Sequence, residues 1–143
     1  LYEKAQERFE RVGKIMGEPK WLTVGMVIAI QEESIVMFGG LAGIRDIGLL
    51  ESAIARPKHL YAYQEDSSIF DLATSLCVAI IRNHPFLDGN KRAGLLSARA
   101  FLFLNDYVFE PLEVDEVEII LGVADGTVDE VELCKWFESY SSK

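Results

Sequence analysis

The sequence of 143 residues has few features that mark membrane, secreted or nucleic-acid-binding proteins. No apolar run approaches the roughly 18 residues of a membrane-spanning helix, and the charged start of the chain does not resemble a secretory signal. The two cysteines, Cys77 and Cys134, match no metal or disulfide spacing, so we expect reduced thiols in a cytoplasmic protein. Fourteen Lys and Arg against 23 Asp and Glu argue against direct binding to nucleic acid or to an anionic membrane.

The residues that are present indicate one helical domain. Half of them are apolar and 26% are charged, which is typical of a soluble globular protein. Apolar residues recur at three- and four-residue spacing, so the fold class is all-α, a helical bundle with a small β-hairpin from 57–66 or 105–110. An amphipathic helix over 2–16 forms an N-terminal extension (1–20), and 21–143 forms the globular domain. The other expected helices cover 24–37, 49–55, 69–82, 90–104, and two stretches after residue 116.

Polar residues and proline predict where several helices begin and end. Thr23 caps the helix over 24–37, and Ser67 or Ser68 caps the helix over 69–82. Pro57 ends the short helix over 49–55, because the residue before a proline disfavours helical backbone. Thr127 and Glu130 have the spacing of a capping box. The apolar stripe ahead of that box consists of Val117, Ile120, Leu121 and Ala124.

The segment from Asn83 to Gly94 carries the candidate site. It joins the two most apolar helices, where a plain turn would be enough, yet it contains a histidine, a carboxylate, an amide and two cations. His84 can act as a general base, because histidine titrates near neutral pH. Asp88 offers a hard oxygen ligand that suits one position on Mg²⁺.

The start of the helix after this segment is expected to bind an anion. Gly89 lets the backbone approach a ligand closely, and Asn90 can cap the helix, whose first N–H groups form an anion site. Lys91 and Arg92 are disfavoured at a helix N-terminus, which already carries about half a positive charge. Two cations at that place therefore indicate a bound anion such as a phosphate chain.

The nine residues His84-Pro85-Phe86-Leu87-Asp88-Gly89-Asn90-Lys91-Arg92 resemble the signature of the Fic/Doc family, H-x-F-x-(D/E)-(G/A)-N-(G/K)-R. Three other stretches, Trp21-Leu22-Thr23 and residues 38–46 and 48–53, resemble the death-on-curing (Doc) branch. The resemblance extends over about 21–141. It implies an all-helical fold and transfer of phosphate from a nucleoside triphosphate, with Mg²⁺, to a hydroxyl of a protein.

The resemblance also implies a role for each residue of the motif. His84 would deprotonate the target hydroxyl, and Asp88 would hold Mg²⁺ on the phosphates of ATP or another nucleoside triphosphate. Arg92 would pair with phosphate oxygens, and Phe86 would anchor the loop in the core. The backbone N–H groups of the anion hole would belong to Gly89, Asn90 and Lys91.

The partners that the resemblance implies are those of a toxin–antitoxin module. Proteins of the Doc branch are toxins held inactive by a Phd-type antitoxin, whose C-terminal segment folds along the toxin. Their associated activity is phosphorylation of a threonine in elongation factor Tu, which stops translation. A homo-oligomer is compatible with the sequence but not predicted by it.

Two departures from the AMP-transferring members of the family favour a kinase. Those members have glycine where this chain has Lys91 and a second arginine where it has Leu95. Arg99 lies about 6 Å further along the helix than Leu95, so we do not expect it to replace that arginine. The alternatives are a nucleotidyl transferase that transfers AMP to a protein hydroxyl, and a catalytically inactive module that only binds partners.

Several residues have two interpretations from sequence alone. His59 is expected in a surface loop, although with His84 and Asp88 it could complete a transition-metal site. Gln31 is expected as a hydrogen-bonded amide at the core edge, although many relatives carry a histidine there that contacts the site. Arg45 and Asp46 either cap the helix that follows or contribute to a lid. The 1–20 extension either covers the core or shields the site, and no inhibitory motif of the Fic type supports the second interpretation.

Overall fold

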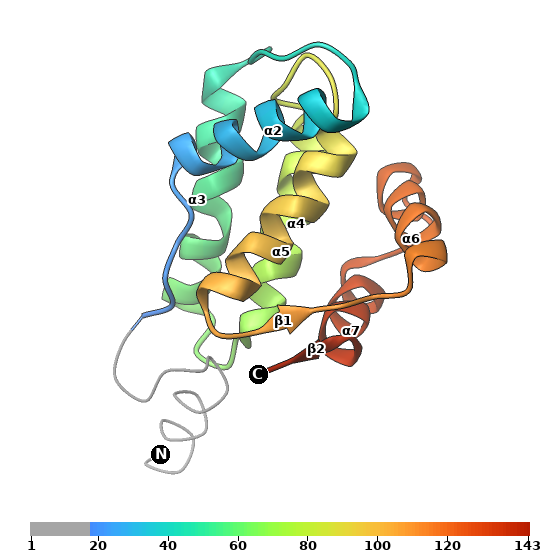
Figure 1. Ribbon diagram of the computed structural model, residues 1–143. Helices are drawn as coiled ribbons and strands as arrows, with labels where there is room; N and C mark the ends of the chain where they lie inside the picture. The colour runs from blue at the N-terminus through green and yellow to red at the C-terminus, as the bar shows by residue number, and fades with distance from the viewer. Residues whose placement is uncertain (1–17) are drawn as a thin grey trace.

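The computed structural model describes residues 18–143, which form six helices and one two-stranded sheet. Figure 1 shows α4 and α5 side by side through the centre, with α2 lying across α3 and α5, and with α6 and α7 on the opposite side. This arrangement confirms the all-α prediction. The helices are α2 (Val24–Phe38), α3 (Ile47–Tyr63), α4 (Ile69–Asn83), α5 (Asn90–Leu104), α6 (Glu113–Asp125) and α7 (Glu130–Ser139), and the strands are β1 (Val108–Phe109) and β2 (Ser141–Ser142).

The centre of the core is the contact between α4 and α5. Most residues of α4 are buried, as its largely apolar sequence predicts. Gly94 of α5 faces α4 so closely that an added Cβ would lie 2.8 Å from a side-chain carbon of Ile81 and 3.0 Å from the Cys77 carbonyl oxygen. The absence of a side chain at Gly94 therefore sets the distance between the two central helices.

Three of the expected helix starts are confirmed. Thr23 accepts a hydrogen bond from the backbone N–H of Met26, and Asp46 accepts one from Leu49. Ser68, rather than Ser67, caps α4 and forms a reciprocal capping box with Asp71. Each of these bonds satisfies a backbone N–H group that has no acceptor within its helix.

The prediction that a short helix ends before Pro57 is wrong. Helix α3 continues through this proline to Tyr63. A proline inside a helix costs about 3 kcal/mol, because it removes a backbone hydrogen bond. Here Pro57 is itself buried, on the same face as Leu50, Ala53 and Ile54, so packing against α4 offsets that cost. His59 consequently lies exposed on a helix and not in a loop.

Two predictions around α6 and α7 are also wrong. The cap of α7 is Asp129, whose side chain accepts from Glu132 N–H, because the helix begins at Glu130 and Thr127 comes too early to cap it. The Thr127 hydroxyl instead donates to Asp125, and this hydrogen bond lowers the pKa of the Asp125 carboxyl. In α6 the buried side is formed by Ile120 and Val123, whereas the expected stripe residues Val117, Leu121 and Ala124 are exposed.

The small sheet joins distant parts of the chain. Strand β1 lies in the predicted 105–110 stretch, but its antiparallel partner is β2, with Phe109 opposite Ser141, so neither expected hairpin forms. Phe109 then packs edge-on against Trp136 and Phe137, at ring-centroid distances of 5.0 and 5.1 Å. These contacts attach α7 to β1, the strand that follows α5.

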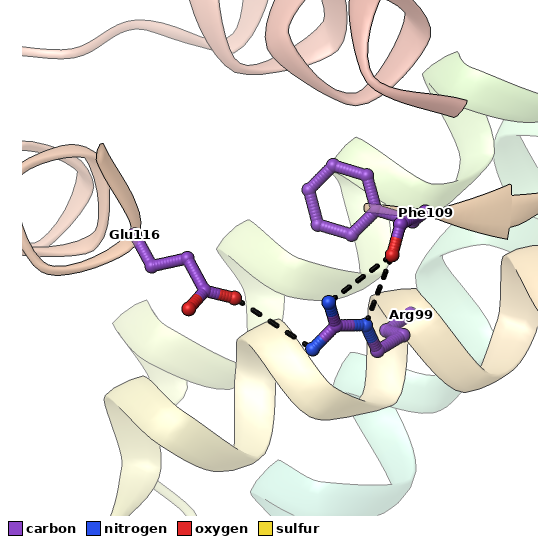
Figure 2. A network of polar contacts seen from close by, with 3 residues as sticks. All are labelled: Arg99, Phe109 and Glu116. Carbon is purple, nitrogen blue, oxygen red and sulfur yellow. Dashed lines mark hydrogen bonds and ion pairs between the residues drawn. The ribbon is translucent and has the colours of Figure 1, made fainter. Parts of the chain in front are cut away.

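Arg99 connects α5 to both β1 and α6 (Figure 2). Its Nε and one terminal nitrogen donate to the Phe109 carbonyl oxygen at 3.3 and 3.1 Å, and its other terminal nitrogen lies 3.6 Å from Glu116. The Arg99 guanidinium is thus held against β1 and α6.

Three further predictions concern the cysteines, membrane-spanning helices and the N-terminal extension. Both cysteines are free; Cys77 is buried and Cys134 half-buried, as expected for reduced thiols. Across the described part of the chain, no helix combines the length and apolar character needed to cross a membrane. The helix expected over 2–16 lies outside the described residues, so the division at residue 20 stays a prediction.

Candidate active site

The predicted site occupies the turn between α4 and α5, at the same end of the molecule as the loop between α2 and α3 (Figure 1). His84 ends α4 in the left-handed conformation, with φ 52° and ψ 53°, and its side chain is exposed. A residue other than glycine rarely adopts this conformation without support from its surroundings. The chain therefore turns sharply at the histidine and presents its imidazole to solvent.

Arg45 provides that support. Its side chain donates to the backbone carbonyl of His84 at 2.7 Å and to that of Asn83 at 3.0 Å. These carbonyls belong to the C-terminus of α4, where a positive charge is stabilised by the helix dipole. Asp46 caps α3 as expected, but the prediction that Arg45 caps the same helix is wrong, because its guanidinium closes the end of α4 instead.

The two loops are also joined through their backbones. Arg45 and Asp46 both donate from their N–H groups to the Pro85 carbonyl, and Leu87 N–H donates to the Gly43 carbonyl. This pairing forms an isolated antiparallel bridge between Ile44 and Phe86. The 39–46 loop is therefore fixed along one edge of the candidate site.

Phe86 and Asn90 hold the turn in the core. Phe86 is fully buried, which confirms its predicted role as the anchor. The prediction that Asn90 caps α5 is wrong: the cap position is Gly89, which supplies no side chain. The buried Asn90 side chain accepts from Phe86 N–H at 2.9 Å and donates to the Phe86 carbonyl at 3.1 Å. The Asn90 side chain thus closes the turn, and its role in the phosphate site stays a prediction.

Asp88 is exposed, and each of its carboxylate oxygens accepts one hydrogen bond. Oδ1 accepts from Gly89 N–H at 2.9 Å, and Oδ2 accepts from Leu41 N–H at 3.3 Å. A carboxylate can accept about four hydrogen bonds, so lone pairs on both oxygens remain for a cation. Gly40 packs directly against this group, since an added Cβ would lie 2.6 Å from Oδ2.

A magnesium ion carried by a nucleotide fits this donor set. Mg²⁺ prefers oxygen ligands and typically takes one or two carboxylates, completing its shell with water and substrate phosphates. Among residues 18–143 no three His, Cys, Asp or Glu side chains group closely enough to hold a metal by themselves. The structure therefore gives no support to the alternative site of His59, His84 and Asp88.

The first turn of α5 presents backbone donors beside Asp88. Gly89 has φ 69°, and the first backbone bond of the helix joins Ala93 N–H to the Gly89 carbonyl. The N–H groups of the three residues between them have no acceptor within the helix, so they can bind an anion. The side chains of Lys91 and Arg92 extend into solvent from the same turn.

Neither Leu95 nor Arg99 places a second arginine at this turn. Leu95 is buried, at 8% exposure, and Arg99 is bound to Phe109 and Glu116 (Figure 2). The sequence-based expectation that Arg99 does not replace an arginine at position 95 is consistent with these contacts.

Helix α2 contributes two side chains to the site, of which Gln31 is a hydrogen-bonded amide, as the sequence predicts. Gln31 is buried, and its amide nitrogen donates to the carbonyls of Asp88 and Leu41, while its amide oxygen has no partner within the described structure. Phe38 lies under Arg92, with the guanidinium carbon 4.0 Å from the ring centroid. Only the polar character of Gln31 on an apolar face signalled its contact in advance, and nothing in the sequence signalled that of Phe38.

Known proteins resemble this chain in sequence. The sequence pattern described as the Fic/DOC family matches residues 21–102, which is more than half of the chain. The chain belongs to the Fic/Doc family. It is 36% identical over 103 residues to "Protein kinase doc" of Escherichia phage P1, a match that covers 71% of this chain and 80% of the phage protein. It is also 35% identical over 89 residues to "Toxin Doc" of Mycolicibacterium smegmatis, covering 61% of this chain and 68% of that protein.

Proposed function

We propose that the chain is a Doc-like toxin that phosphorylates a hydroxyl of a protein target, using ATP or another nucleoside triphosphate with Mg²⁺. One observation carries the proposal: a single turn presents an exposed histidine, a carboxylate with free lone pairs and a helix N-terminus with unbonded N–H groups. These are the parts that phosphoryl transfer needs, namely a base, a metal ligand and an anion site. The similarity to proteins named as a Doc kinase and a Doc toxin supports it further.

His84 is the proposed general base. In the reaction, the target hydroxyl oxygen forms a bond to the γ-phosphorus, and the bond from that phosphorus to the β,γ-bridging oxygen breaks. The hydroxyl proton moves to the His84 imidazole, and the nucleoside diphosphate leaves. The fixed backbone around His84, held by Arg45, keeps the imidazole at the mouth of the turn before substrate arrives.

Asp88 is the proposed protein ligand of the magnesium ion, which supplies charge neutralisation on the phosphates when bound. The backbone N–H groups of Asn90, Lys91 and Arg92 are proposed to bind phosphate oxygens, with Gly89 allowing close approach. The Arg92 guanidinium adds a planar donor set that matches phosphate geometry. Lys91 adds positive charge at the same turn.

The proposed donor group is the terminal phosphate rather than AMP. Lys91 fills space that glycine leaves open in AMP-transferring relatives. This chain also has leucine at position 95, where those relatives have a second arginine. Leu95 is buried and uncharged, and Arg99 is paired with Glu116. Lys91 and Arg92 are therefore the cations that α5 offers to a nucleotide at its first turn. Transfer of AMP and an inactive binding module are the two competing functions.

We also propose a Phd-type antitoxin as partner, because the chain resembles a protein named as a Doc toxin. An apolar groove of about 480 Å³ between α2, α5 and β1 suits the apolar face of a helical antitoxin segment. Residues lining it include Ile30, Met37, Leu96, Ala100 and Phe103. Phe103→Glu is expected to retain phosphotransfer and toxicity but to lose protection by a co-expressed antitoxin; protection that persists would contradict this groove as the docking surface.

The proposed target is elongation factor Tu, by resemblance to the Doc branch, in the bacterial cytoplasm where translation occurs. The test incubates the purified chain with Mg²⁺, a bacterial lysate and ATP labelled on either the γ- or the α-phosphate. A band labelled from γ alone, at the size of elongation factor Tu and absent with His84→Ala, is the expected result. Label from α would replace the kinase with a nucleotidyl transferase, and no label from either would favour the inactive module.

A further inference from the structure

Phe38 and Arg92 form a contact between two elements that are far apart in the sequence. Phe38 is the last residue of α2, and Arg92 lies in the first turn of α5. The guanidinium carbon of Arg92 lies over the Phe38 ring, 4.0 Å from its centroid. This distance is well within the roughly 6 Å over which an aromatic face attracts a cation.

The contact leaves the guanidinium able to bind phosphate. An aromatic ring attracts the face of a guanidinium, whereas the five N–H donors lie in the guanidinium plane and point away from its face. Within residues 18–143, no carboxylate pairs with Arg92, in contrast to Arg56 and Arg99. The arginine is therefore held by a partner that does not compete for its donors.

The backbone that carries Phe38 is fixed relative to the site. Helix α2 ends at Gly39, which has φ 87° and donates from its N–H group to the Ile35 carbonyl at 2.8 Å. The next residue, Gly40, packs against the Asp88 carboxylate, and the Ile35 side chain lies 3.3 Å from where a Cβ of Gly89 would be. The last turn of α2 is thus packed against the motif on both sides of Phe38.

Packing in the core does not explain why position 38 is a phenylalanine. Its side chain is 57% exposed, so it adds little to the core. Lys91, the other cation of this turn, has no aromatic ring beneath it among the described residues. The Phe38 ring therefore contacts Arg92, whose planar guanidinium suits phosphate, and not Lys91.

We propose that Phe38 is a positioning residue that orders Arg92 for the phosphates of the nucleotide. The inference rests on the proposed function, because it assigns Arg92 to the phosphate site. A free arginine side chain samples many rotamers and loses this freedom when it binds. The ring reduces that loss by keeping the guanidinium beside the α5 N-terminus before the nucleotide arrives.

The test measures binding of Mg²⁺-ATP by calorimetry and the kcat and KM of transfer. It uses Phe38→Ala, Phe38→Leu, Phe38→Trp and Arg92→Ala, and the double variant Phe38→Ala/Arg92→Ala. Tyr63→Ala is the control, since Tyr63 is an even more exposed aromatic residue at the C-terminal end of α3. Thermal unfolding of each variant establishes that it is folded.

Phe38→Ala and Phe38→Leu are both expected to weaken nucleotide binding about two- to fivefold and to raise KM more than they lower kcat. Phe38→Trp restores the affinity of the unmodified chain, because tryptophan presents the strongest aromatic face. Tyr63→Ala has no effect on binding. In the Arg92→Ala background, loss of the Phe38 ring has no additional effect, because the ring acts through the arginine.

Full affinity with Phe38→Leu, or an additional loss in the Arg92→Ala background, would overturn the positioning role. These results differ from failure of the proposed function itself. In that case Arg92→Ala would bind nucleotide as well as the unmodified chain, or the unmodified chain would bind none.

Discussion

The side-chain amide of Gln31 donates to the backbone carbonyl of Asp88 at 3.1 Å and to that of Leu41 at 3.3 Å. One buried group of α2 thus ties the turn between α4 and α5 to the loop beside it. Leu41 in turn donates its N–H to the Asp88 carboxylate. The position of this carboxylate therefore depends on a residue outside the family motif.

Replacement of Gln31 by leucine is expected to loosen this connection. Two carbonyls lose their donor, which destabilises the fold by about 1–3 kcal/mol and lowers transfer activity. Urea unfolding and the transfer assay measure the two effects. Ser34→Ala is the matched control, because Ser34 is buried one turn further along α2 and its hydroxyl has no partner within the described structure. Equal stability of the two variants would show that the Gln31 bonds do not hold the loop.

Gly40→Ala is expected to reduce activity much more than Gly39→Ala. Both glycines have positive φ, 113° and 87°, so alanine is strained at either position. Only at Gly40 would the added Cβ meet another group, the Asp88 carboxylate at 2.6 Å. Titration of Mg²⁺ in the transfer assay measures the difference, with a higher magnesium requirement expected for Gly40→Ala alone. The same requirement in both variants would contradict the placement of Asp88.

Gly94→Ala is expected to destabilise the protein although alanine favours helices. The gain in helix propensity is about 1 kcal/mol, whereas the crowding of Ile81 and the Cys77 carbonyl costs about 1–3 kcal/mol. Gly25→Ala is the control: Gly25 is exposed, and its added Cβ would be 3.9 Å from the nearest atom outside its neighbours. In urea unfolding, the free energy of unfolding is expected to rise slightly for Gly25→Ala and to fall for Gly94→Ala. A higher free energy of unfolding for both variants would contradict the close packing of α5 against α4 at Gly94.

The thiol of Cys77 is expected to react slowly in the folded protein. Burial raises the pKa of this thiol from 9.0 to about 12, so the native state keeps the proton that the unfolded state releases. The thiol therefore contributes stability below pH 9, and this contribution is lost as the pH rises toward 12.

A disulfide reagent at about pH 8 measures this protection, because only the thiolate is the reactive form. In a Cys134→Ser variant, which leaves Cys77 as the single thiol, labelling is expected to be slow until urea unfolds the chain. Rapid labelling without urea would contradict the burial of Cys77.

The sequence predicted the helices whose signals are local. Helix α5 runs from Asn90 to Leu104 as expected, because its apolar pattern is continuous and its start coincides with a charged motif. Helix α3 was predicted too short, because the rule for proline considers only the neighbouring backbone and Pro57 is stabilised by burial against another helix.

The motif was likewise predicted more accurately than its surroundings. The burial of Phe86 follows from its apolar side chain within a polar turn. Asn90 has the right residue type for a cap, yet its side chain bonds to the backbone of Phe86, four residues earlier. The contacts of Gln31 and Phe38 with the motif bridge more than fifty residues, and no periodicity in a single sequence specifies such pairs.

The mass of the modified target tests the kinase assignment most directly. The labelled protein is recovered from lysate after reaction with the unmodified chain or with His84→Ala, and its intact mass is compared with that of untreated protein. We predict an increase of one phosphate group with the unmodified chain and no increase with His84→Ala. An increase by a whole nucleoside monophosphate, or an unchanged extent of modification with His84→Ala, would contradict the phosphotransfer function and the role of this histidine.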